Sequence, residues 1–232
     1  MTGSALTIAR VWGIPIKLHF SLLLALPFLA YYYDLLTAVG IFISIALHEL
    51  GHSTVAMRRG CRVREILLTP IGGAARMDHM PRRPLDEILM AIAGPAVSLA
   101  LFALLLFGGA WLPLEREPID AGSSILHLNA IQVLGIINLF LACFNLIPAF
   151  PMDGGRVLRA LLMLRLSRLR ATLIAARIGQ TLAVAAAVFA VSHQRFMLVA
   201  VAVFVFWAAE MEYRMVRAEE RIALPEAIRL FA

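Results

Sequence analysis

Long apolar runs, separated by short segments rich in arginine, are the feature that most limits what this chain can fold into. Several runs reach the roughly 20 residues that a helix needs to cross a bilayer. Of the 232 residues, 61% are apolar and only 16% are charged, whereas soluble domains carry about a quarter charged residues. We therefore expect an all-α polytopic membrane protein. About six spans are predicted, at residues 18–34, 35–57, 88–112, 125–147, 172–192 and 196–213.

The arginines predict how these spans are oriented. Most lie in the segments that six spans place on one side, whereas the opposite side holds only Arg116 and Arg195, with Arg177 inside the fifth span. Because positively charged loops stay in the cytoplasm, we expect cytoplasmic N- and C-termini in a multi-pass membrane protein, and the cell membrane of a prokaryote is the expected location. No basic run is interleaved with aromatic residues, so the net charge of +6 does not predict nucleic-acid binding.

One segment between the second and third spans departs from the helical pattern. Residues 62–68 have β character, and residues 69–73, Thr-Pro-Ile-Gly-Gly, indicate a turn or bend. A short β-hairpin or strand segment is therefore expected there. The two cysteines, Cys61 and Cys143, have the spacing of neither a zinc finger nor a redox pair, so both are expected to be free thiols.

The strongest chemical signal is the sequence His48-Glu49-Leu50-Gly51-His52. Residues four apart on a helix share a face, so the two imidazoles can bind one zinc ion while the glutamate between them acts as a base. The run from Ile41 to Leu47 is apolar, which places the motif inside a membrane span, where ionisable residues are costly and indicate function. The alternative is a buried polar cluster that only helps helices to pack.

A catalytic zinc site usually has three protein ligands and one open position, and Asp153 is the best candidate for the third. It follows Pro148 and Pro151, which must break the fourth span, and it precedes two glycines that permit unusual backbone angles. A broken helix at membrane depth is tolerated where it lines a cavity or is buried in protein. The alternative is an Asp-Gly turn at the membrane surface.

Taken in order along the chain, these motifs resemble the site-2 protease family of intramembrane metalloproteases. The resemblance covers residues 11–165 and also includes Gly13-Ile14-Pro15, His19-Phe20-Ser21, Ala93-Gly94-Pro95 and the stretch from Asn145 to Arg156. Members of the family often carry an asparagine where this chain has Ser98, and the pattern assigns Ser98 no polar role.

The resemblance implies one zinc ion per chain, and it implies that Gly72 and Gly73 belong to a membrane-dipping strand that pairs with an unwound substrate. Asn145 matches a position near the active site and is expected to contact substrate. The expected function is hydrolysis of peptide bonds in or near transmembrane segments of membrane proteins, known as regulated intramembrane proteolysis. The implied zinc ligands and catalytic base are His48, His52, Asp153 and Glu49.

The expected domain organisation is a transmembrane metalloprotease domain at 1–215 and a short cytoplasmic amphipathic tail at 216–232, without a PDZ or CBS domain. The expected partners are a transmembrane protein substrate and the lipid bilayer, and the sequence does not predict an oligomeric state. There are two rival functions: a membrane zinc protease of another class, and a non-enzyme that is either a zinc transporter or an inactive binding protein. The other protease would carry a later Glu or His ligand on a helix. The transporter would have ionisable residues on several spans and in both halves of the membrane, and the inactive protein would have lost Glu49.

Overall fold

The fold is that of a computed structural model, which describes residues 5–32, 35–69, 72–78, 83–112, 117–120 and 125–230. The predicted turn residues Pro70 and Ile71 lie outside this range. Contacts divide the chain into two compact parts, one formed by Met1–Pro81 with Ala93–Phe144 and the other by Arg82–Ile92 with Asn145–Ala232. Each part is described by itself below.

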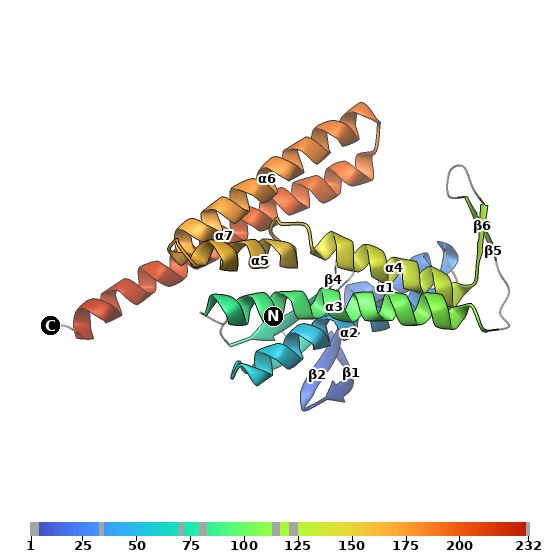
Figure 1. The fold of residues 1–232 in the computed structure, drawn as a ribbon, viewed down its shortest axis with the longest axis horizontal. Helices are drawn as coiled ribbons and strands as arrows, with labels where there is room; N and C mark the ends of the chain where they lie inside the picture. Colours follow the sequence, from blue (N-terminus) through green and yellow to red (C-terminus); the bar gives the residue numbers. More distant parts are fainter. Residues whose placement is uncertain are drawn as a thin grey trace. The chain divides into compact units, whose positions relative to one another are not determined.

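The first part contains two small sheets and most of four helices (Figure 1). Its strands are β1 (Ala5–Val11), β2 (Ile14–His19), β3 (Val63–Thr69), β4 (Gly72–Met77), β5 (Glu117–Asp120) and β6 (Ile125–Leu128), and its helices are α1 (Phe20–Tyr32), α2 (Leu35–Arg58), the later part of α3 (Pro84–Gly109) and α4 (Ala130–Asn145).

A four-stranded sheet in the order β1-β2-β3-β4 is larger than the sequence predicted. The expected strand segment forms β3 and β4, which are antiparallel, and β2 adds to β3 in parallel. Trp12 and Gly13, with φ of 49° and 82°, make the two-residue turn between β1 and β2, because a tight hairpin of this type needs positive φ at both positions. The buried core between this sheet and helices α1 and α2 consists of Ile14, Ile16, Leu22, Leu50, Ile66 and Leu68.

Four helices among the described residues are long and apolar enough to cross a membrane. The remaining two predicted spans correspond to α1, with 13 residues, and α4, with 16. At 1.5 Å per residue these helices are about 20 and 24 Å long, shorter than the roughly 30 Å of bilayer hydrocarbon. The start of each predicted span pairs as a strand instead, since Leu18 pairs with Leu68 and residues 125–128 pair with β5. The four candidates are Leu35–Arg58, Pro84–Gly109, Arg168–Ser192 and Phe196–Ile222.

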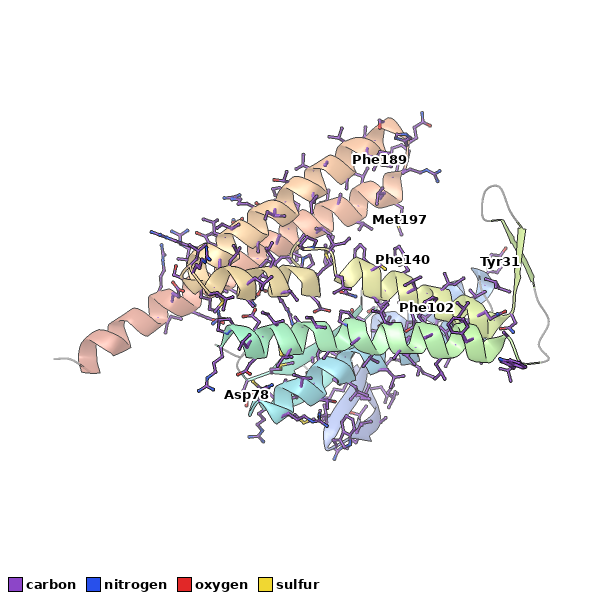
Figure 2. The ribbon with its side chains drawn as sticks, in the orientation of Figure 1. Tyr31, Asp78, Phe102, Phe140, Phe189 and Met197 are labelled. Carbon is purple, nitrogen blue, oxygen red and sulfur yellow. The ribbon has the colours of Figure 1, made fainter. Side chains whose placement is uncertain are left out.

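The second part contains the first residues of α3 together with α5 (Asp153–Met163), α6 (Arg168–Ser192) and α7 (Phe196–Leu230). Helices α6 and α7 form a long hairpin (Figure 1), joined by residues 193–195. Small residues on α6, among them Ala171, Ala175 and Ala183, are buried, which lets neighbouring helices approach closely. Phe189 and Met197 lie at the loop end of the hairpin (Figure 2) and are 55% and 82% exposed, as expected for side chains that face lipid.

Candidate metal centre

Helix α2 places the two histidines and the glutamate of the motif together. The helix runs without proline from Leu35 to Arg58, so the four-residue spacing puts His48 and His52 one above the other on the same face. Both imidazoles are buried, at 3% and 4% exposure, and their Nε2 atoms lie 3.1 Å apart. The ligand atoms of His48, Glu49 and His52 all lie within 4.8 Å of one another, so this cluster could hold a metal ion.

The donor set fits zinc. Two nitrogen ligands at the usual 2.0–2.1 Å from one tetrahedral zinc ion lie about 3.3 Å apart, close to the 3.1 Å between the Nε2 atoms of His48 and His52. Imidazole suits zinc and other transition metals, whereas magnesium and calcium prefer oxygen ligands. The two imidazoles could therefore hold a zinc ion without rearrangement.

Helix α3 lies close against the Nε2 edges of both imidazoles. A Cβ added to Gly94 would collide with His52 Nε2 and would lie 2.6 Å from His48 Nε2. A Cβ added to Gly51 of α2 would lie 2.8 Å from the carbonyl oxygen of Ala93. Glycine at both positions is thus what allows α2 and α3 to approach and the histidines to stay on the inner face of α2.

Ser98 had no polar role in the sequence pattern, yet it lies next to His48 in the structure. Its Oγ lies 2.9 Å from His48 Nδ1, and its side chain is fully buried. Ser98 follows Gly94 by four residues, so the two share a face of α3. Gly94 packs on the imidazoles, so the four-residue spacing between Gly94 and Ser98 is the sequence signal that could have identified Ser98.

Strand β4 lies against Glu49. The backbone N–H of Ala75 donates to Glu49 Oε2 at 3.2 Å, and a Cβ added to Gly73 would collide with Glu49 Cγ. Gly73 is therefore close to Glu49, and its contact with substrate stays a prediction. Gly72 lies on the same strand with φ of +138°, a conformation that favours glycine, and no described atom lies within 4 Å of its added Cβ.

An ion-pair cluster ties β4 to the rest of the sheet. Glu65 of β3 pairs with Lys17 of β2 at 2.6 Å and with Arg76 of β4 at 2.9 Å. The hydrogen bond from Lys17, followed by the positive charges of Lys17 and Arg76, holds the pKa of the Glu65 carboxyl below its usual value, although partial burial acts against this. The cluster therefore favours the arrangement that keeps β4 beside Glu49 when Glu65 is ionised.

Asp153 and Asn145 belong to the second compact part, so their predicted roles as third ligand and substrate contact stay predictions. Helix α4 ends at Asn145, as the two prolines predicted, and Asp153 begins α5 with 7% exposure. The segment between them turns tightly. A Cβ on Gly154 would collide with the carbonyl oxygens of Leu146 and Ile147, and one on Gly155 would lie 2.5 Å from the nitrogen of Phe150.

The chain is similar to known metalloproteases over most of its length. The family model of Peptidase family M50 matches residues 36–114 and 119–186. Zinc metalloprotease MJ0392 of Methanocaldococcus jannaschii is 38% identical over 218 residues, which cover 90% of this chain and 61% of that protein. Stage IV sporulation protein FB of Bacillus subtilis is 32% identical over 116 residues, which cover 49% of this chain and 36% of that protein.

A solved structure gives the same result. The Site-2 Protease from Methanocaldococcus jannaschii superimposes with a TM-score of 0.67 at 37% sequence identity, covering 90% of this chain and 95% of that one. The chain spans between about a third and about three fifths of the length of the two curated relatives described above.

Proposed function

Because the chain belongs to peptidase family M50 and is of the site-2 protease type, we propose that it is a zinc metalloprotease that cleaves peptide bonds in or near the transmembrane segments of other membrane proteins. One observation carries the proposal. His48, Glu49 and His52 form a metal-competent cluster on α2, a helix long and apolar enough to cross a membrane. A hydrolytic centre on a membrane-spanning helix has access to peptide bonds inside the bilayer, which soluble proteases do not reach.

His48 and His52 would hold one zinc ion per chain, with Asp153 as the third ligand. Three protein ligands are the usual number for a catalytic zinc, which keeps one position open. The position of Asp153 at the start of α5, where its side chain is 7% exposed, supports the assignment, because a carboxylate oxygen is one of the ligand types that zinc takes. When bound, zinc supplies Lewis acidity that polarises a carbonyl and lowers the pKa of water.

Glu49 is assigned as the general base. Its carboxylate accepts the proton of the attacking water and then donates it to the leaving amine. The N–H of Ala75 supports this role, because it holds one carboxylate oxygen at 3.2 Å and leaves the other available. Gly73 supports it as well, because only the absence of a side chain there leaves room for the Glu49 stem.

The substrate is proposed to bind as an added strand at β4. This strand is last in the sheet order, and peptides commonly bind by extending an exposed sheet edge. A transmembrane helix hides its peptide bonds in its own hydrogen bonds, so it must unwind before hydrolysis, and pairing with β4 replaces some of the bonds it loses. The contact between Ala75 and Glu49 means that such a strand would lie beside the base. Asn145 is proposed as a further substrate contact.

We propose six spans, with α1 and α4 also inside the bilayer, and with both termini in the cytoplasm. Mean hydropathies of the four long candidates range from 1.5 to 2.4, and the two shorter helices are similarly apolar in composition. The strong arginine asymmetry between the two sides supports the orientation. With this placement, we propose that the substrates lie in the same bilayer and that the reaction is regulated intramembrane proteolysis.

The test is zinc-dependent cleavage in liposomes. The protein is reconstituted with a reporter whose single apolar span of about 20 residues contains a central Asn-Gly pair that weakens the helix. Cleavage should stop when a chelator removes the metal, and zinc but not magnesium should restore it. Asp153→Ala should lower both zinc content and cleavage, whereas Asp78→Asn at the end of the sheet should change neither. Metal-independent cleavage would contradict the proposed function, and full zinc content in Asp153→Ala would contradict the third ligand.

A further inference from the structure

His48 makes a polar contact with Ser98 of α3, a residue outside the motif that runs from His48 to His52. Ser98 Oγ and His48 Nδ1 are 2.9 Å apart, and both side chains are buried, at 0% and 3% exposure. A buried hydroxyl without a partner costs free energy, and a serine on an apolar helix ordinarily bonds to its own backbone. A serine that instead reaches a histidine on another helix is therefore informative about that histidine.

Imidazole chemistry fixes what this contact does when His48 binds a metal. A neutral imidazole carries one N–H and one nitrogen with a free lone pair. Nε2 of His48 lies 3.1 Å from Nε2 of His52, so Nε2 is the nitrogen that faces the shared metal position. The proton then resides on Nδ1, and Nδ1–H donates to the Ser98 oxygen.

The packing of α3 makes this hydrogen bond directional. Gly94 brings the α3 backbone against both imidazoles, and Gly51 brings α2 against the carbonyl of Ala93. With the two helices held this close, a side chain one turn beyond Gly94 has a fixed position relative to the ring of His48. Backbone thus lies close to the Nε2 edge of the His48 ring, and the Ser98 hydroxyl lies at its Nδ1.

We propose that Ser98 is a positioning residue for the metal centre: its hydroxyl oxygen accepts the Nδ1–H of His48, selects that tautomer and aims Nε2 at the zinc ion. The inference rests on the proposed function, because it requires His48 to be a ligand. Partners of this kind on metal-binding histidines are commonly worth 10- to 100-fold in metal affinity.

The test measures zinc affinity by competition with a chromophoric chelator, using the whole chain in detergent micelles. Ser98→Ala should weaken zinc binding by about 10- to 100-fold. Ser98→Thr and Ser98→Val have nearly the same shape and differ in the hydroxyl. Ser98→Thr should therefore bind zinc more tightly than Ser98→Val by a similar factor. Comparing this pair removes the effect of added volume in a tightly packed position.

Ser53 provides a matched control. It lies on α2 beside His52 and is fully buried, and its Oγ has no hydrogen-bond partner among the described residues. Ser53→Ala thus deletes a buried hydroxyl near the same site without removing a bond to a ligand, and it should leave zinc affinity unchanged. Equal losses in Ser53→Ala and Ser98→Ala would overturn the inference, and so would equal affinities of the Thr and Val variants.

His48→Ala separates this inference from the proposed function. If His48→Ala abolishes zinc binding while Ser98→Ala binds as tightly as the parent chain, the positioning role is wrong and the metal centre stands. If His48→Ala keeps zinc bound with unchanged affinity, the metal centre itself is wrong. A loss in both variants, with rescue in Ser98→Thr, supports both proposals.

Discussion

A buried arginine in the second compact part provides the most quantitative prediction about stability. Arg159 of α5 is fully buried, and its guanidinium contacts Glu87 at the start of α3 at 2.6 Å and Glu212 of α7 at 2.7 Å. It also lies over the Phe150 ring, 5.0 Å from its centroid. One side chain thus links three helices and the segment that precedes Asp153.

Replacing Arg159 by Met keeps a long apolar stem and removes the charge. The carboxylate of Glu87, which is 1% exposed, is then left without its cation. Breaking a buried ion pair in this way costs about 3–5 kcal/mol, equivalent to a roughly 140- to 3,700-fold shift in the folding equilibrium at 1.4 kcal/mol per factor of ten. The lost contact with Phe150 acts in the same direction.

The assay is equilibrium unfolding in mixed micelles, followed by circular dichroism. Adding Glu87→Met to Arg159→Met should recover much of the loss, because apolar residues can replace a buried ion pair at little cost. Arg214→Met is the control, since Arg214 pairs with Glu210 with 69% of its own side chain exposed, and such surface pairs contribute about 1 kcal/mol or less. The predicted cost is wrong if Arg159→Met unfolds like the parent chain, or if adding Glu87→Met lowers the stability further.

Three further predictions concern the first compact part. Gly73→Ala should lower cleavage by about 10- to 100-fold with zinc content unchanged, because the new Cβ displaces Glu49; cleavage and bound metal are measured on the same sample. Gly94→Ala should weaken zinc binding in chelator competition, because its Cβ occupies the space of both imidazoles. The pKa of Glu65 is lowered in the folded state, chiefly by Lys17. The stability that the Glu65 ion pairs give the sheet is therefore complete above the usual pKa near 4.3 and is lost as pH falls through the lowered pKa. Hydrogen exchange of the β3 and β4 amides should rise as the pH falls over that range.

Each of these predictions has a control and a contradicting result. Gly108→Ala lies on the same helix as Gly94 with open space around its Cβ, and it should bind zinc normally; equal losses in the two variants would contradict the crowding argument. For Gly73→Ala, unimpaired cleavage would contradict the prediction that a Cβ at this position displaces Glu49. In Glu65→Gln the acid-induced rise in hydrogen exchange should be absent, and an unchanged pH profile would show that another group causes it.

The centre of the site was predictable from the sequence because local rules determine it. The spacing of His48 and His52 fixes their common face on any helix, and the apolar run before them predicts that helix. Strand β3 was predictable from the β character of its segment. For Asp153, the sequence predicted the broken helix that precedes it, and α4 does end at Asn145, while its role as a ligand stays a prediction.

The features that were missed depend on distant contacts. Leu18, at the start of the first predicted span, belongs to β2 and pairs with β3, some fifty residues later. Hydropathy alone does not distinguish a short buried strand from a helix. Ser98 acquires its role only because glycines bring α2 and α3 together. The hydrogen bond from Ala75 to Glu49 likewise depends on how the sheet packs on α2, which the motif itself does not encode.

The role of Glu49 is tested most directly by measuring bound zinc and cleavage in the same liposome samples of the parent chain and of Glu49→Gln. The amide keeps the size of the side chain and cannot accept a proton from water. We expect unchanged zinc content and a fall in cleavage of about 10²- to 10⁴-fold, the usual contribution of general acid–base catalysis. Cleavage that persists at the parent rate with zinc bound would contradict the assignment of Glu49 as the catalytic base.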